Sequence, residues 1–333
     1  MTLTAPRTLV KTRHAPHQME AEFTIRRIFV TGGSGFVGSA VVGELLARGY
    51  GVNALVNRTP VRTPGDVRSF PGGLFDAAAV DAAVRGCDAA VHLVGIIAED
   101  TKRGVTFERM HVDGTRAVLD AAARAGVRRL VHMSALGTRP DAVSDYHRTK
   151  WRAEELVRAS GLDWTILRPS LIHGPGGEFM QMAARWARGT AAPFLFMPYF
   201  SDTMLPTFGT GRAGALQPVF VGDVARAFSD AVEKPVTVGQ TYALAGAEQL
   251  TWTDLHRAIA KAVRGRPRLV ASLPAWYATL LTRVLPARLL PFNRDQVVMS
   301  QENNTADVAP FVRDFGWAPR PFRDSLHDYA TTL

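Results

Sequence analysis

A glycine-rich segment at residues 31–38 constrains the fold of this chain more than any other feature. It reads TGGSGFVG and separates a β-rich run from a helical stretch. Gly32 permits a tight turn, Gly35 lets the backbone approach a pyrophosphate, and Gly38 allows a helix to pack closely against a strand. The helix N-terminus adds free N–H groups and a positive dipole end for phosphates. The residues expected to contact a dinucleotide here are Gly32, Gly33, Ser34, Gly35, Phe36, Val37 and Gly38.

Strands and helices alternate regularly around and after this segment. The sequence predicts strands at residues 26–31, 52–56, 88–94, 129–134 and 164–167. It predicts helices at residues 39–48, 76–85, 107–125 and 146–160. Asp76 is the expected N-cap of the second helix, and Gly126 is expected to end the third. Strands that alternate with helices at this spacing form a parallel sheet covered on both faces, so the predicted fold class is α/β, a Rossmann-type doubly wound sheet.

The regular alternation breaks after residue 169. Residues 189–217 are rich in Pro, Gly, Phe and Met, which indicates a long loop or lid. Helices are predicted near residues 223–232 and after Thr251, which is the expected N-cap. Residues 273–292 are strongly apolar, and we expect them to pack inside the core or lid of this part of the chain. An amphipathic helix on a membrane surface is the alternative.

The composition excludes several classes of protein and of site. The single cysteine, Cys87, excludes an internal disulfide framework and a zinc site built from cysteines. No uncharged apolar run reaches the roughly 18 residues typical of a membrane-spanning helix. Of the 39 basic residues most are arginines scattered along the chain, so we expect no nucleic-acid partner. We also expect no metal site, since His14 and His17 form the only close histidine pair. The single cysteine favours a reducing compartment, so we expect a cytoplasmic location.

The residues after the second predicted strand bear on the choice of cofactor. An acidic side chain there binds the ribose 2′-hydroxyl of NAD(H), whereas a nearby arginine favours the 2′-phosphate of NADP(H). In this chain Val56 is followed by Asn57 and Arg58, with no acid. NADP(H) is therefore favoured, and NAD(H) stays open as the alternative.

A tyrosine and a lysine four residues apart lie on the fourth predicted helix. Tyr146 and Lys150 share one helical face, so the phenol and the ammonium can sit together. A neighbouring ammonium lowers the pKa of a phenol, which makes Tyr146 a candidate general acid or base. Ser134 ends the preceding strand, where its hydroxyl can polarise a substrate carbonyl or, alternatively, satisfy local backbone groups. These three residues are the predicted catalytic set, with a plain solvent-facing helix surface as the alternative for the Tyr/Lys pair.

Together these motifs resemble the extended short-chain dehydrogenase/reductase superfamily. The resemblance also rests on HVDGT at residues 111–115, on Arg168–Pro169 and on HGPG at residues 173–176. Further segments resemble the atypical branch that contains the nucleotide-binding accessory subunit of respiratory complex I. Those segments are MSALG at residues 133–137, QPVFVGDVA at residues 217–225, and LP at residues 273–274 with DQV at residues 295–297. The similarity spans roughly residues 25–325.

The resemblance implies roles for individual residues. Tyr146 is the implied catalytic acid or base. Lys150 is implied to adjust the pKa of Tyr146 and to bind the nicotinamide ribose. Val94, Gly95 and Pro169 are implied cofactor contacts. Two positions depart from the family pattern: His111 stands where an asparagine is common, and residues 72–74, GGL, lack the acid that usually meets adenine.

The resemblance also implies a division of the chain into functional regions. Residues 25–175 are expected to form an NAD(P)-binding domain. Residues 1–24 are expected from their composition to be a flexible basic leader, because Arg7, Lys11 and Arg13 precede any acidic residue; an organelle-targeting peptide is the alternative. Residues 176–333 are expected to form a smaller substrate-binding region, from which segments around residues 218–232 return to the nucleotide-binding core.

We therefore expect an NAD(P)-dependent oxidoreductase that moves a hydride to or from a carbonyl or carbinol carbon of a small molecule. If the apolar segment contacts a membrane, that molecule is expected to be apolar. A cofactor-binding structural or assembly subunit of a respiratory membrane complex, without turnover, stays open as an alternative; it would be attached peripherally to the membrane or the complex. A nucleotide-sugar epimerase or dehydratase also stays open, because its reaction too begins with hydride removal. A redox-sensing regulator is disfavoured because that role does not need the Tyr/Lys pair.

Overall fold

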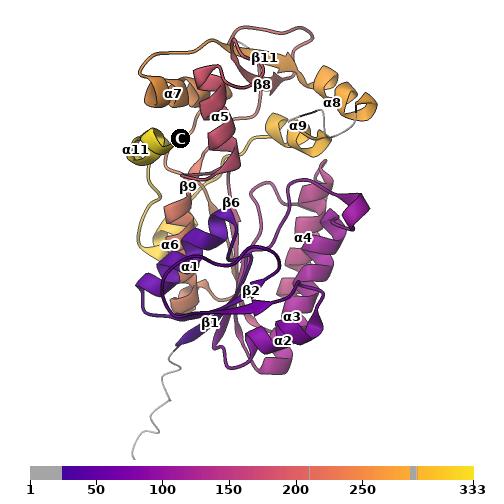
Figure 1. Ribbon diagram of the computed structural model, residues 1–333, viewed down its shortest axis with the longest axis vertical. Helices are drawn as coiled ribbons and strands as arrows, with labels where there is room; N and C mark the ends of the chain where they lie inside the picture. The colour runs from indigo at the N-terminus through magenta and orange to yellow at the C-terminus, as the bar shows by residue number, and fades with distance from the viewer. Residues whose placement is uncertain (1–24, 210, 286–289, 291) are drawn as a thin grey trace, which may run out of the picture.

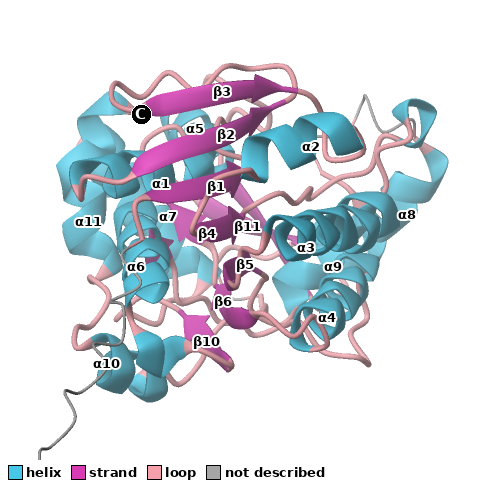
Figure 2. Cartoon of the chain, turned by 90° about the horizontal axis from the view of Figure 1, so that it is seen from below, coloured by secondary structure: helices cyan, strands magenta, loops and turns pink. Residues whose placement is uncertain are grey.

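The computed structural model describes residues 25–209, 211–285, 290 and 292–333, so the expected leader lies outside the described residues. Its central sheet has seven parallel strands in the order β10–β6–β5–β4–β1–β2–β3 (Figure 2). These strands are β1 (Arg27–Thr31), β2 (Gly51–Val56), β3 (Val67–Pro71), β4 (Ala89–His92), β5 (Arg129–Met133), β6 (Asp163–Pro169) and β10 (Gln240–Leu244). The chain runs outward from β1 to β3 and then returns to β4. The carboxyl ends of β1 and β4 therefore form the switch point at which such sheets bind ligands.

Helices cover both faces of the sheet (Figure 2). One face carries α2 (Ala77–Val84), α3 (Gly114–Ala125) and α4 (Asp145–Arg158), and the other carries α1 (Phe36–Ala47), α6 (Val221–Glu233) and α10 (Ala309–Phe315). Side chains of β1 alternate between the two, since Ile28 and Val30 pack with α1 and α6 while Phe29 packs with α2 and α3. The predicted Rossmann-type fold is confirmed.

Local capping signals predicted several helix ends correctly. Asp76 accepts a hydrogen bond from the Ala79 amide at the start of α2, and Gly126 ends α3 with a φ of 73°. Thr251 caps α7 (Trp252–Arg264) through the Asp254 amide. The helix predicted from residue 107 differs at its start, because residues Glu108–Asp113 form a π-helix before α3 begins. A π-helical turn carries an extra residue per hydrogen-bonded ring, which changes the direction in which its side chains point.

The rest of the chain forms a second region beyond the carboxyl ends of the strands (Figure 1). Its remaining elements are α5 (Glu178–Arg188), α8 (Ala275–Val284), α9 (Arg294–Gln301), α11 (Phe322–Tyr329), β7 (Ile172–His173), β8 (Met197–Ser201), β9 (Val219–Phe220) and β11 (Val270–Pro274). The short helices of the chain are η1 (Thr101–Arg103), η3 (Pro235–Thr237) and η5 (Ala330–Thr332). A separate apolar core joins α5, α7 and α11.

Two expectations for this second region were wrong. Residues 189–217 are not an unstructured loop, because β8 lies within them and pairs in parallel with β11 from Met197–Val270 to Ser201–Pro274. Local sequence could not reveal this pairing, since the partner strand lies some 70 residues away. The apolar 273–292 segment was expected to pack inside, yet α8 leaves Trp276 and Val284 exposed. In the described part of the chain, no helix is both long and apolar enough to cross a membrane.

Candidate functional site

The residues singled out in the sequence gather at the carboxyl edge of the sheet. Because all seven strands are parallel, the ends of β1, β2, β4, β5 and β6 meet there. The glycine loop follows β1, Asn57 and Arg58 follow β2, and Val94 and Gly95 follow β4. Ser134 follows β5 and Pro169 ends β6. One edge of the sheet thus carries all of these predicted residues, while Tyr146 and Lys150 approach it from α4.

The glycine loop has the geometry of a phosphate cradle. Gly32 has a φ of 77°, and a Cβ on it would lie 3.2 Å from the Val94 backbone nitrogen. A Cβ on Gly38 would lie 1.9 Å from the Gly32 carbonyl oxygen, so only glycine fits the first turn of α1. Gly35 is exposed, and a Cβ there would meet nothing closer than 3.4 Å. The space above Gly35 is therefore open to a ligand, which fits the diphosphate of a dinucleotide.

The start of α1 leaves backbone donors for that ligand. Gly35 is the N-cap and has no side chain to satisfy the first N–H groups of the helix. Ser34 and Gly35 are exposed, whereas the Phe36 ring turns toward the 174–177 loop, where a Cβ on Gly177 would meet it at 3.1 Å. The loop thus presents N–H groups and a helix dipole at the switch point of the sheet.

Lys150 ties the loop after β4 to the end of β5. Its Nζ donates a hydrogen bond of 3.0 Å to the Met133 carbonyl oxygen. It also lies so close to Gly95 that a Cβ there would meet it at 2.9 Å. Burial lowers the pKa of Lys150 to about 8, although Glu154 one turn further along opposes the shift. The Lys150 ammonium therefore holds its proton less tightly than a free lysine does.

Tyr146 lies one helical turn before Lys150, at the start of α4. Its ring makes edge-on contacts with the rings of Phe107, His111 and His147, at centroid separations between 5.1 and 5.9 Å. We expected Lys150 to lower the pKa of the phenol, and this was wrong for the protein without ligand. Burial instead raises the pKa of Tyr146 to about 12. The phenol is therefore protonated at neutral pH.

Ser134 is buried at the end of β5. Its amide donates to the Leu167 carbonyl oxygen at 2.8 Å, and its hydroxyl donates to the Thr138 hydroxyl at 3.3 Å. The hydroxyl is thus engaged by a neighbouring side chain through a long hydrogen bond, which a stronger acceptor could displace.

His111 joins the loop after β4 to α4. Its Nε2 accepts a hydrogen bond of 3.2 Å from the Ile96 amide, so its Nδ1 carries the hydrogen and donates to the Thr149 hydroxyl at 2.9 Å. Burial and the Lys150 ammonium lower the pKa of His111 to about 2. His111, at a position where an asparagine is common in the family, is therefore neutral. It connects the loop after β4 to α4 through these two hydrogen bonds.

More imidazoles lie beneath the site, inside the sheet. His92 on β4 bonds the Thr31 hydroxyl through Nδ1 at 2.7 Å and the Thr115 hydroxyl through Nε2 at 3.2 Å. His132 on β5 stacks on His92 at 5.3 Å. Burial lowers the pKa of His92 to about 3 and that of His132 well below its ordinary value. The floor of the site is therefore polar but uncharged.

A buried ion-pair cluster supports α4, and it was not predicted from the sequence. The carboxylate of Glu154 is fully buried and accepts two hydrogen bonds, of 2.7 and 2.6 Å, from the Arg168 guanidinium. Arg158 forms a second ion pair with the same carboxylate. The signal was present, since Glu154 follows Lys150 by four residues on one helical face.

The positions relevant to cofactor choice are open to solvent. Asn57 and Arg58 are both exposed just past the end of β2. A Cβ on Gly73 would lie 4.0 Å from the Asn57 side chain, so the two loops that flank an adenosine site in this fold are neighbours here. Among the residues that the structure describes, no cluster of three metal-ligating side chains occurs.

Comparison with known proteins agrees with this geometry. Residues 32–183 match a family model described as NAD(P)H-binding. The chain is 30% identical to the ceramide reductase of Caulobacter vibrioides, over 73% of this chain and 72% of the relative. It is 28% identical to the mitochondrial NADH dehydrogenase (ubiquinone) 1 alpha subcomplex subunit 9 of Rattus norvegicus, over 69% of this chain and 60% of the relative.

A solved structure shares the fold across nearly the whole chain. The dTDP-glucose 4,6-dehydratase DesIV of Streptomyces venezuelae, with NAD bound, superposes with a TM-score of 0.72 and 23% identity. The match covers 92% of this chain and 96% of DesIV. The glycine loop, the Rossmann-type sheet and these similarities together show that the chain belongs to the extended short-chain dehydrogenase/reductase superfamily of NAD(P)-dependent oxidoreductases.

Proposed function

We propose that this protein is an NADP(H)-preferring reductase of a carbonyl group on an apolar small molecule, acting from a substrate-binding region within residues 176–333. One observation carries the proposal: the Lys150 ammonium donates a hydrogen bond to the Met133 carbonyl oxygen at the end of β5 and lies beside Gly95, one helical turn from a protonated Tyr146. This arrangement lies at the switch point beside an open glycine loop, where a bound nicotinamide would supply or accept a hydride.

Each member of the set has a chemical task in this proposal. Tyr146 holds a proton at its hydroxyl at neutral pH, which suits a general acid that protonates the carbonyl oxygen of a substrate. Lys150 would supply positive charge for that oxygen and for the nicotinamide ribose, and Ser134 would donate a hydrogen bond to the same oxygen. His111 holds the Ile96 amide and α4 in register, so it acts as a positioning residue.

The cofactor preference rests on the end of β2. Arg58 is exposed and no acidic residue follows Val56, so a 2′-phosphate would meet a guanidinium where a 2′-hydroxyl would find no carboxylate. Titration of the purified protein with NADPH and NADH, followed by tryptophan fluorescence, is expected to give tighter binding of NADPH. In R58A that preference should fall about ten-fold, as expected for one lost charge-assisted contact. Equal preference in both proteins would refute the assignment of Arg58.

The identity of Tyr146 as the acid is tested by Tyr146→Phe. With carbonyl substrates screened by NADPH consumption, Y146F is expected to lose at least about 100-fold in kcat while binding NADPH as the parent does. Tyr50→Phe is the matched control, because Tyr50 is also half-buried but its hydroxyl binds Glu233, away from the site. Undiminished turnover in Y146F would refute the catalytic assignment.

A second candidate function is a cofactor-binding assembly or structural subunit of a respiratory membrane complex. The similarity to the NADH dehydrogenase subunit of Rattus norvegicus favours it. In that case NADPH would raise the unfolding temperature of the protein, yet no carbonyl substrate or nucleotide sugar would be turned over. Turnover of a nucleotide sugar instead of a carbonyl compound would assign the chain to the epimerase-like members of the superfamily.

A further inference from the structure

The loops around β8 and the helix α8 carry large apolar side chains in contact with solvent. We define the outer apolar surface as Leu195, Met204, Leu205, Phe208, Trp276 and Val284, whose exposed fractions lie between 54% and 79%. They come from the loops on either side of β8 and from α8, which lie together at the top of Figure 1. Soluble monomers rarely expose so many large apolar side chains on one face without a partner for them.

Hydrogen bonds hold these segments side by side as one surface. Arg268, just before β11, donates to the Phe194 carbonyl oxygen in the loop before β8. In the loop after β8, the Thr207 amide donates to the Ser272 hydroxyl at 3.1 Å. The Trp276 indole donates to the Met204 carbonyl oxygen at 3.2 Å. The exposed side chains therefore sit on a frame that is tied together in three places.

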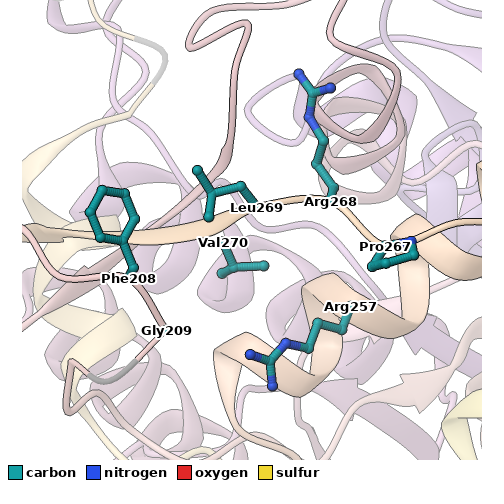
Figure 3. A pocket seen from close by; sticks show the side chains of 7 residues that line it. All are labelled: Phe208, Gly209, Arg257, Pro267, Arg268, Leu269 and Val270. Atoms are coloured by element: carbon teal, nitrogen blue, oxygen red, sulfur yellow. The ribbon is translucent and has the colours of Figure 1, made fainter.

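Two arginines line a hollow in this surface. Phe208, Leu269 and Val270 line a hollow of about 380 Å³ together with Arg257 and Arg268. Figure 3 shows the two guanidinium groups on opposite sides of the Leu269–Val270 segment, with Phe208 beside it. The apolar residues are thus flanked by cationic side chains.

The sequence around these arginines is strongly basic. Between Asp254 and Asp295 it has eight basic residues and no acidic one. In the described part of the chain, Arg257, Arg264, Arg266, Arg268 and Arg283 form no ion pair, although most arginines near the central sheet, such as Arg48 and Arg168, do. Unneutralised guanidinium groups around exposed apolar side chains are complementary to a surface that is anionic outside and apolar beneath.

We propose that the outer apolar surface is where this protein binds an anionic lipid bilayer. Trp276 and its neighbours insert at the level of the headgroups, and the arginines pair with lipid phosphates. A second copy of the chain is a poorer fit, because self-association would bring two such cationic stretches face to face. Binding would bring the region beyond the strand ends to the membrane, where apolar molecules reside. This inference does not depend on the proposed reaction.

Sedimentation of the full chain with lipid vesicles tests the proposal. Binding is expected with vesicles of phosphatidylcholine and phosphatidylglycerol and should be weak with phosphatidylcholine alone. It should also fall as salt rises, because salt screens exposed charges. In R266Q/R283Q the affinity is expected to fall about 25-fold, since each arginine near an anionic surface contributes about five-fold. In L205S/F208S it is expected to fall at least about ten-fold, because less apolar area enters the bilayer.

Matched controls separate a surface effect from a general loss of charge or fold. Arg85 and Val236 are exposed in the segments just before β4 and β10, at the amino ends of the strands and away from the outer apolar surface. R85Q and V236S should therefore bind vesicles as the parent does. All variants should bind NADPH normally, which shows that they are folded and leaves the proposed reaction untouched. Failure to bind anionic vesicles, or equal losses in the control variants, would overturn the proposal. Dimerisation that L205S/F208S abolishes, without vesicle binding, would assign the surface to a second copy instead.

Discussion

Gly35, Gly38 and Gly43 lie within nine residues in and after the glycine loop. Replacing each of them with alanine adds one methyl group, and these three variants test the role of the loop. The structure gives each of them a different environment. On Gly38 the new Cβ would lie 1.9 Å from the Gly32 carbonyl oxygen and 2.7 Å from its carbon, which are backbone atoms that cannot rotate away. On Gly35 the nearest atom is at 3.4 Å, and on Gly43 it is the Thr63 methyl at 3.9 Å.

The expected effects differ in kind. Gly38→Ala should lower the free energy of unfolding by about 3 kcal/mol or more, because the loop and α1 must separate. Gly43→Ala should raise it by about 0.5–1 kcal/mol, because alanine restricts the unfolded chain in a position where the helix has room. Gly35→Ala should leave stability nearly unchanged, since its φ of −76° suits any residue. It should nevertheless weaken NADPH binding at least about ten-fold, because the methyl group occupies the space assigned to the diphosphate.

Urea unfolding and NADPH titration on the same three variants separate these outcomes. Gly43→Ala serves as the control for the titration, since it lies on the same helix and should bind NADPH normally. If Gly35→Ala bound NADPH as tightly as the parent, the diphosphate would not lie against this loop. If Gly38→Ala were as stable as Gly43→Ala, the close contact of α1 with Gly32 would be wrong.

Two further predictions concern α4. Because burial lowers the pKa of Lys150 to about 8 from an ordinary 10.5, the unfolded chain binds more protons than the folded one between these values. Stability should therefore rise by about 2 kcal/mol from pH 8 to 9.5, as measured by urea unfolding, and Lys150→Met should lack this rise. Glu154→Gln should cost about 3–5 kcal/mol, because it leaves the Arg168 guanidinium without its buried carboxylate, whereas Glu155→Gln on the exposed neighbour should change stability by less than about 0.5 kcal/mol.

Each of these predictions has a contradicting result. An equal pH dependence in Lys150→Met would mean that another group titrates in this range. Equal stabilities of Glu154→Gln and Glu155→Gln would mean that the buried pair contributes nothing that an amide cannot replace.

Features set by short-range signals were predicted well from the sequence. The glycine loop, the cap at Asp76 and the spacing of Tyr146 and Lys150 each depend on a few adjacent residues, and the structure has them at the carboxyl edge of the sheet or on the adjoining helix. The alternation of strands with helices was enough to fix a parallel sheet, because buried parallel strands carry apolar runs that differ clearly from helical patterns.

Features set by distant partners could not be predicted in this way. The strand β10 joins the sheet only through its register with β6, more than 70 residues earlier in the chain. The neutral state of His111 depends on the Ile96 amide and Thr149, which come from two other segments. The predicted shift in the pKa of Tyr146 had the wrong direction, because the sequence spacing places Lys150 nearby but does not reveal that the phenol is buried.

The buried imidazoles make the folded state less stable at acidic pH. Six histidines, His92, His111, His132, His147, His173 and His256, have a lowered pKa in the folded chain, chiefly because of burial. When the chain unfolds, each regains an ordinary pKa near 6.5 and takes up a proton below it. Unfolding then gains up to about 1.4 kcal/mol per histidine for every further pH unit. Over about two pH units below 6.5, the summed effect of these groups becomes comparable with the 5–15 kcal/mol that holds a typical protein folded. Acidification should therefore unfold the sheet and its candidate site together in one cooperative transition. The folded state is expected to be most stable at neutral and alkaline pH.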